Sequence, residues 1–275
     1  MNNTDEIAPT TTEDFAEASR VEALGAGRYR AEVPDGWQQG RGTFGGLVLG
    51  TLARALQHAE PDRDRAFRAL NGEVVGPVMP GVAEITVSAL RRGSGLSSWE
   101  ARLTQGGDVL ARASAIFGRE RTRDHDVTEL ARPVMKSWRE VDVVPIAPPL
   151  GPRFARMYEL RATGPLPFTG GERAVTEGWV RLRRPVPMGV AELIGAVDAY
   201  WPASFARAAA PRPMATVSFT FELLADPATL DASEPLYYRA VAAGGYGGFV
   251  AELRELWAAD GTLVALNPQT FAVIK

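Results

Sequence analysis

The sequence predicts an α+β fold made of two tandem copies of one unit, in which a long antiparallel sheet wraps around a mostly apolar helix. The segments GGDVLARASAIF (106–117) and DGTLVALNPQTF (260–271) share a turn glycine, an apolar pair, an alanine and a phenylalanine ten residues after the aligned glycine. The elements around these segments also repeat, as one strand, one helix and four strands in each half. Wrapping the sheet around the helix buries the apolar sides of both.

In the first half, GRYRAEVP (27–34) has the pattern of a strand, and GGLVLGTLARALQHA (45–59) that of a helix. This helix is apolar on most sides, which is typical of a helix enclosed by other structure. Four strand-like runs follow, separated by the turn signals MPG, RGSG and QGGD. They cover residues 66–78, 82–92, 97–105 and 108–118.

The second half repeats this series. EGWVRLRRP (177–185) predicts a strand that ends at a proline, and the apolar periodicity of 188–208 predicts a helix. Four further strands are expected at 214–224, 235–243, 248–258 and 262–274.

These two units describe a double hot-dog fold, with two tandem hot-dog repeats in one chain. We expect an N-terminal hot-dog repeat over 1–120, a charged and then proline-rich connector over 121–174, and a C-terminal hot-dog repeat over 175–275. A β-barrel that carries one helix per half is the alternative, since periodicity alone does not separate the two.

The composition indicates a protein that acts on a small molecule. With 45% hydrophobic residues, 23% charged residues and a formal net charge of −3, the chain predicts no broad nucleic-acid or membrane footprint. The absence of cysteine excludes disulfides, thiolate nucleophiles and cysteine-ligated metals. The polar, acidic N-terminus and the lack of an apolar run of about 20 residues predict a cytoplasmic protein.

One aspartate stands out in VDAYWP (197–202). Ile194 lies four residues before Asp198 and Trp201 three residues after it, which places the carboxylate in an apolar row of the predicted helix. An aspartate on a helix is most often a surface charge or a cap, but a buried carboxylate needs a partner or a function. Asp198 is therefore a candidate functional residue.

Two further candidates lie in the last strands. Thr216 begins an alternating run in which Val217 and Phe219 share the opposite face, although ordinary β-propensity also explains a threonine there. Gln269 follows Pro268, and a proline within a strand marks an edge or a bulge. Ala115 occupies the matching position in the first half, so we expect only one of the two pseudo-equivalent sites to keep polar residues.

Several segments in this order and spacing resemble the acyl-CoA thioesterase II (TesB-like) double hot-dog family. They are GRGTFGGLVLGTLARAL (40–56), WVRLRRPVP (179–187), LIGAVDAYWP (193–202), MATVSFTFEL (214–223) and GTLVALNPQTFAVIK (261–275). The resemblance implies an acyl-CoA thioesterase of lipid metabolism whose hydrolytic residues are Asp198, Thr216 and Gln269.

Hydrolysis of a thioester needs a positioned water, a group that takes its proton and donors for the oxyanion. Asp198 is suited to accept the proton, and Thr216 and Gln269 to hold the water, without a cofactor, a metal or a covalent intermediate. The turn at Phe44, Gly45 and Gly46 begins the first helix, where free N–H groups would face the substrate.

Two other functions stay open. A non-catalytic hot-dog protein that binds acyl-CoA or an acyl carrier would be favoured if Asp198 lay in a structural ion pair. A hot-dog hydratase typically relies on histidine, whereas His58 is expected at the end of a helix and His125 in a solvated connector. Exposed strand edges also predict association into homo-oligomers through back-to-back sheets.

Overall fold

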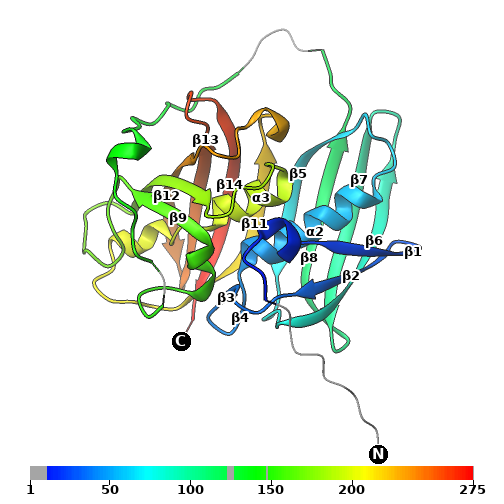
Figure 1. Cartoon of the computed structure of the whole chain (residues 1–275), viewed down its shortest axis with the longest axis horizontal. Coiled ribbons are helices and arrows are strands. Elements are labelled where there is room, and N and C mark those ends of the chain that lie inside the picture. Colours follow the sequence, from blue (N-terminus) through cyan, green and yellow to red (C-terminus); the bar gives the residue numbers. More distant parts are fainter. Residues whose placement is uncertain (1–10, 123–126, 147, 275) are drawn as a thin grey trace, which may run out of the picture.

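One continuous antiparallel sheet of twelve strands carries the fold in the computed structural model of the chain, which describes residues 11–122, 127–146 and 148–274 (Figure 1). The strands of the first half lie in the order β1 (Val21–Gly25), β2 (Arg28–Val33), β6 (Gly81–Arg92), β7 (Leu96–Gln105), β8 (Asp108–Gly118) and β5 (Ala66–Val74). Those of the second half continue the sheet as β11 (Met214–Leu223), β14 (Leu263–Val273), β13 (Phe249–Trp257), β12 (Leu236–Tyr246), β10 (Val175–Leu182) and β9 (Tyr158–Ala162).

The two halves repeat the same strand order outward from the boundary between β5 and β11, as in a pseudo-twofold arrangement. Gly72 pairs with Phe219 at this boundary. The predicted double hot-dog fold is confirmed. The barrel alternative is wrong, because the described sheet has two edges, β1 and β9, and does not close.

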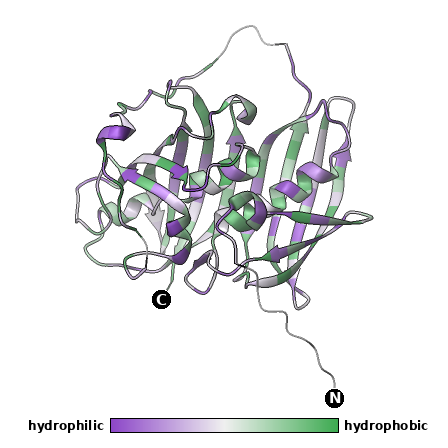
Figure 2. Ribbon diagram, viewed as in Figure 1, coloured by the Kyte–Doolittle hydropathy of each residue, from purple (hydrophilic) through white to green (hydrophobic). Residues whose placement is uncertain are grey.

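Two antiparallel helices, α2 (Gly45–Ala59) and α3 (Val190–Asp198), lie side by side against the concave face of this sheet (Figure 1). Every residue of α3 is buried. Both helices contain hydrophobic residues, coloured green in Figure 2. The helices approach closely at Gly50, where a Cβ atom would lie 3.1 Å from the carbonyl oxygen of Ala191. Arg54 of α2 also forms an ion pair with the buried Glu192 of α3, which links the C-terminal end of one helix to the N-terminal end of the other.

Short elements close the ends of this core. The helix α1 (Phe15–Ala18) places Phe15 against Trp37, and the hairpin of β3 (Gln38–Gln39) and β4 (Gly42–Thr43) leads directly into α2. Four 3₁₀ turns complete the described elements: η1 (Trp138–Glu140), η2 (Arg153–Met157), η3 (Ala203–Ala206) and η4 (Pro227–Thr229). No helix among the described residues is both long and apolar enough to cross a membrane.

Part of the segment between the two repeats, within residues 130–138, packs against the outer face of the second half of the sheet. Trp179, Tyr237 and Trp257 form a separate apolar cluster there, and Trp138 and Met135 pack over it. The sequence predicts a connector over 121–174, and the structure places β9 within that range, paired with β10.

The predicted helix over 188–208 is wrong in its extent. The helix ends at Asp198, and the chain turns before Pro202 and continues as η3. Trp201 therefore does not belong to the helix, although it is buried. Proline restricts the residue before it to extended conformations, which ends the helical path even though the apolar pattern continues.

Candidate active site

The structure brings Asp198, Thr216 and Gln269 into one hydrogen-bonded cluster. Asp198 lies at the C-terminal end of α3, while Thr216 and Gln269 lie on the neighbouring strands β11 and β14. The Nε2 atom of Gln269 donates to Oδ1 of Asp198 at 3.0 Å and to Oγ1 of Thr216 at 2.6 Å. These residues are far apart in the sequence, and the sheet that curves around α3 joins them.

A β-bulge directs Thr216 into this cluster. The pairing of β11 with β14 shifts register between Thr216 and Ser218, so Val217 is an extra residue in its strand. The predicted alternation, with Thr216 facing away from Phe219, is therefore wrong. Gln269 is opposite the buried Phe219, and the bulge turns Thr216 to the same face.

The cluster is largely enclosed. Asp198 and Gln269 are 7% and 3% exposed, whereas Thr216 is half-buried. Both Nε2 hydrogens of Gln269 are used, because Asp198 and Thr216 each accept one. The Oε1 atom of Gln269 is buried and has no hydrogen-bond partner among the described residues. It is therefore free to accept a hydrogen bond from a water or a substrate.

The N-terminus of α2 meets the other oxygen of Asp198. A Cβ atom on Gly45 would lie 3.1 Å from Oδ2, and the N–H of Gly46 hydrogen-bonds to the carboxylate. Leu47 and Val48 donate their N–H groups to the carbonyl of Phe44, so the N–H groups of Gly45 and Gly46 precede the helical ladder. A half-buried Gly45 thus presents a backbone donor beside the carboxylate.

Of the three predicted substrate-binding residues, Phe44 has a different environment. Its ring is fully buried and stacks on Phe154 with centroids 3.9 Å apart. A Cβ atom on Gly46 would approach this ring to 2.5 Å. Phe44 therefore fixes the turn by packing, and Gly45 is the partly exposed member of the three.

The sequence analysis missed Arg254, a buried arginine that contacts the cluster. It is 1% exposed, and its Nη1 atom donates to Oδ1 of Asp198 at 3.1 Å and to the carbonyl of Val197 at 3.2 Å. Its Nε atom donates to Glu252 at 3.3 Å, and Glu252 accepts the N–H of Ser204. The available signal was the spacing of 252, 254 and 256, which places two charges on the inward face of a strand.

Opposing effects act on the Asp198 carboxyl. Burial raises its pKa, while the charge of Arg254 and the hydrogen bonds from Gln269 and Gly46 lower it, with a net rise above the ordinary value. The carboxylate also lies at the C-terminal end of α3, where the helix dipole disfavours negative charge. This carboxylate is held in an environment that favours proton uptake.

The other half of the protein holds apolar residues at the matching positions. Phe67 precedes a bulge in β5 and pairs with Phe117, just as Thr216 precedes a bulge in β11 and pairs with Phe271. Ala115 matches Gln269, and when Gly50 of α2 is aligned with Gly195 of α3, Ala53 matches Asp198. The polar side chains of the cluster therefore occur at one of the two pseudo-equivalent sites.

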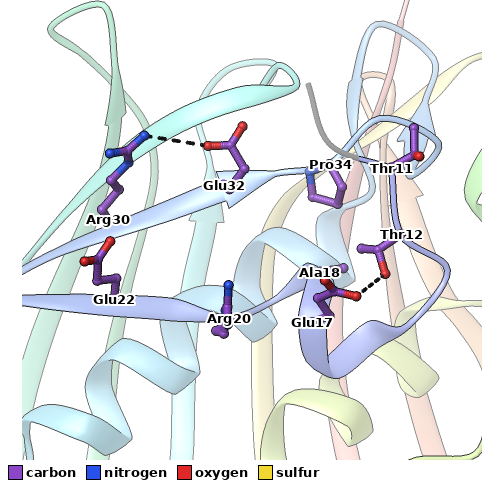
Figure 3. A pocket seen from close by; sticks show the side chains of 9 residues that line it. All are labelled: Thr11, Thr12, Glu17, Ala18, Arg20, Glu22, Arg30, Glu32 and Pro34. Atoms are coloured by element: carbon purple, nitrogen blue, oxygen red, sulfur yellow. Dashed lines mark hydrogen bonds and ion pairs between the residues drawn. The ribbon is translucent and has the colours of Figure 1, made fainter. Parts of the chain in front are cut away.

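Surface hollows lie away from the cluster. One of about 420 Å³ is lined by Glu17, Glu22 and Glu32 together with Arg20 and Arg30 (Figure 3). A larger one of about 1130 Å³ opens at the pseudo-equivalent position, between the end of α2 and the start of α3.

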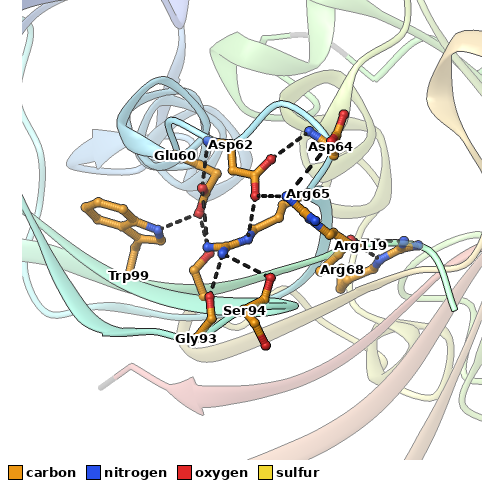
Figure 4. A network of polar contacts seen from close by, with 11 residues as sticks. Glu60, Asp62, Asp64, Arg65, Arg68, Gly93, Ser94, Trp99 and Arg119 are labelled. Carbon is orange, nitrogen blue, oxygen red and sulfur yellow. Dashed lines mark hydrogen bonds and ion pairs between the residues drawn. The ribbon is translucent and has the colours of Figure 1, made fainter.

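A polar network borders the larger hollow. The buried Glu60 accepts hydrogen bonds from Ser97 and Trp99, and Arg65 lies 3.6 Å from Glu60 and donates to the carbonyl of Gly93 (Figure 4). This network ties the end of α2 to the hairpin between β6 and β7.

His58 lies outside the cluster. His58 is exposed near the end of α2, where its Nδ1 is 3.3 Å from the hydroxyl of Tyr29, as expected for a helix-end position. His125 is outside the described residues. Within the described ranges, no group of three or more histidine, aspartate and glutamate side chains is arranged to hold a metal.

Two family models match the chain. The model described as the acyl-CoA thioesterase N-terminal domain matches residues 33–118, and the model of the acyl-CoA thioesterase C-terminal domain matches residues 129–273. No curated protein sequence matches.

Solved structures share the fold over most of the chain. A conserved protein of unknown function with a hot-dog fold from Alicyclobacillus acidocaldarius is 26% identical, with a TM-score of 0.87 over 95% of this chain and 98% of that chain. The acyl-CoA thioesterase II TesB2 from Mycobacterium marinum is 18% identical, with a TM-score of 0.75 over 95% and 98%. The tesB protein of Mycobacterium avium subs paratuberculosis is 16% identical, with a TM-score of 0.78 over 95% and 99%.

Proposed function

Given that the chain belongs to the acyl-CoA thioesterase family, we propose that it hydrolyses an acyl-CoA thioester to a free acid and CoA, with Asp198 as the general base. One observation carries this proposal. Arg254 and Gln269 both donate to Oδ1 of Asp198, whereas Oδ2 faces the N-terminus of α2 beside the half-buried Gly45. Both side-chain donors therefore lie on Oδ1, and Oδ2, which faces the backbone N–H groups of α2, keeps a lone pair for a proton.

In the proposed reaction, a water bound between Oδ2 of Asp198 and Oε1 of Gln269 gives a proton to Asp198 and attacks the thioester carbonyl carbon. The carbonyl π electrons move to oxygen, and the resulting oxyanion accepts the N–H of Gly45 at the positive end of α2. Collapse of the tetrahedral intermediate breaks the C–S bond. The CoA thiolate leaves and takes the proton from Asp198, which restores the base.

Thr216 and Gln269 act together in this mechanism. Because the Thr216 oxygen accepts a hydrogen bond from Gln269, its own hydroxyl proton is available for the water or for the acyl carbonyl. The chain has no cysteine, and His58 lies at the end of α2 that is far from Asp198. Direct attack by water is therefore the route that the side chains of the cluster support.

The test is thiol release, measured with a thiol-reactive dye, from acyl-CoAs of increasing chain length and from acyl-carrier thioesters. We expect Asp198→Asn to lower kcat by about 100-fold or more with binding retained, since general-base catalysis contributes about 10²–10⁴-fold. Glu192→Gln is the matched control, because Glu192 is another buried acid on α3 that pairs with Arg54 at the far end of the helix. Full activity in Asp198→Asn would contradict the assignment.

A second function is favoured by a specific observation. Asp198 lies in a buried ion pair with Arg254, with nitrogen and oxygen 3.1 Å apart, which is the arrangement expected if the chain binds acyl-CoA without hydrolysing it. Calorimetric binding of an acyl-CoA, together with no CoA release from any thioester in the panel, would select this function over hydrolysis.

A further inference from the structure

Arg254 of β13 links two buried carboxylates, that of Glu252 on the same strand and that of Asp198 at the end of α3. It lies 3.1 Å from Asp198 and 3.3 Å from Glu252, and both acids are almost completely buried. The guanidinium also lies over the ring of Phe271, 4.9 Å from its centroid. Since the guanidinium is planar and donates from fixed directions, these contacts hold one oxygen of Asp198 in place.

This arginine occurs together with the predicted hydrolytic residues and is missing where they are missing. Gln269 pairs with Glu252 across β14 and β13, and the matching Ala115 pairs with Trp99 across β8 and β7. Two residues further along, Asn267 pairs with Arg254, while the matching Ala113 pairs with Ala101. The pseudo-equivalent site therefore carries neither the arginine nor its second acid.

We infer that Arg254 is a positioning residue that keeps Asp198 ionised and directs its Oδ2 atom at the reacting water. Glu252 competes for the same guanidinium and so weakens the interaction between Arg254 and Asp198. The inference rests on the proposed function and extends it to two residues that do not contact the reacting atoms. A buried carboxylate with no cation beside it would take up a proton and cease to be a base.

The other groups around Asp198 do not supply this charge. Burial raises the pKa of Tyr158 and of Tyr238 far above the usual range, so both are neutral near neutral pH. Glu192, on α3 itself, adds negative charge and is paired with Arg54. Among the described residues packed against Asp198, Arg254 is therefore the cation.

Substitutions of Arg254 and of Glu252 are expected to change the pH dependence of kcat/KM in opposite directions. Arg254→Gln removes the stabilising charge, so the acid limb is expected to move up by about 1 to 3 pH units, with activity recovering at high pH. Glu252→Gln removes a competing acid and leaves Arg254 to Asp198 alone, so the acid limb is expected to move down. Arg254→Lys keeps the charge but loses the fixed geometry, and should fall between wild type and Arg254→Gln.

A purely structural role would not produce shifts of opposite sign. An acid limb that stays in place in Arg254→Gln, or that moves in the same direction in both variants, would overturn the inference. If Arg254→Gln does not fold, Arg254→Lys and Glu252→Gln decide the question.

A second measurement separates this inference from the proposed function. The carboxyl carbon of Asp198 is titrated by ¹³C NMR in wild type and in the variants, with its resonance assigned by its absence in Asp198→Asn. Wild type without turnover on any thioester would refute the proposed hydrolysis, while the titration midpoints still test the inference. Midpoints that do not shift in opposite directions would refute the inference even in an active enzyme.

Discussion

A methyl group on Gly45 should separate activity from stability. The Cβ of Gly45→Ala would lie 3.1 Å from Oδ2 of Asp198, a few tenths of an ångström closer than ordinary contact, in the space proposed for the water and the thioester carbonyl. Gly45 is the first residue of α2, and alanine is favoured over glycine in helices by about 1 kcal/mol or less. We expect the free energy of unfolding to change by less than about 1 kcal/mol and kcat/KM to fall at least about tenfold.

The neighbouring glycine provides the matched control. A Cβ on Gly46 would lie 2.5 Å from the ring of Phe44 and 3.0 Å from the Cβ of Asp198, so Gly46→Ala should cost about 1–3 kcal/mol of stability from overpacking. Urea denaturation and CoA release are measured on both variants. Wild-type kcat/KM in Gly45→Ala, with its stability unchanged, would refute the placement of the reacting groups beside Gly45.

Three further outcomes are expected. Gln269→Ala removes two hydrogen bonds and the free Oε1, so kcat for thioester hydrolysis should fall about 100-fold, and the loss of a donor to the buried Asp198 should lower the free energy of unfolding by about 1–3 kcal/mol. The raised pKa of Asp198 means that the folded chain binds more protons than the unfolded chain from about pH 4 up to that pKa. Stability should therefore fall as pH rises through this window. The Tm of Asp198→Asn should rise relative to wild type over the same window, and a constant difference would contradict this sign. Ser97→Ala leaves the buried Glu60 without one donor and should cost about 1–3 kcal/mol by urea denaturation, with kcat unchanged.

The repeated hydrophobic pattern was enough to predict most of the fold. The helix over 45–59 was predicted with its observed bounds, because its apolar residues have a clear helical period and a glycine pair begins it. The helix over 188–208 was too long, because Tyr200 and Trp201 continue the apolar row while the backbone has already turned at Asp198. Periodicity reports burial, and a buried loop of large side chains gives the same signal as a buried helix.

The site was less accessible to sequence reasoning, for two physical reasons. The bulge at Val217 reverses the face of the sheet to which each residue before it in β11 points. An alternating sequence pattern contains no sign of the inserted residue. Arg254 contacts Asp198 across 56 residues of sequence, and its role depends on a sheet register that one sequence does not reveal. The identities of Asp198, Thr216 and Gln269 as candidates came mainly from the family resemblance, and their chemical roles stay predictions.

The difference between the two halves follows from the cost of burying charge. Both halves have a β-bulge near the start of the corresponding strand, β5 in the first half and β11 in the second. The two sites therefore differ in their side chains and not in this feature of the backbone. Placing two acids and an arginine in a protein interior costs several kcal/mol in desolvation for each ion, and hydrogen bonds recover only part of it. The first half avoids this cost with apolar residues at the five matching positions, which are Ala53, Phe67, Trp99, Ala101 and Ala115. A chain that fuses two repeats is free to differentiate them, and a buried charge cluster at one of the two matching sites costs less desolvation than a cluster at both.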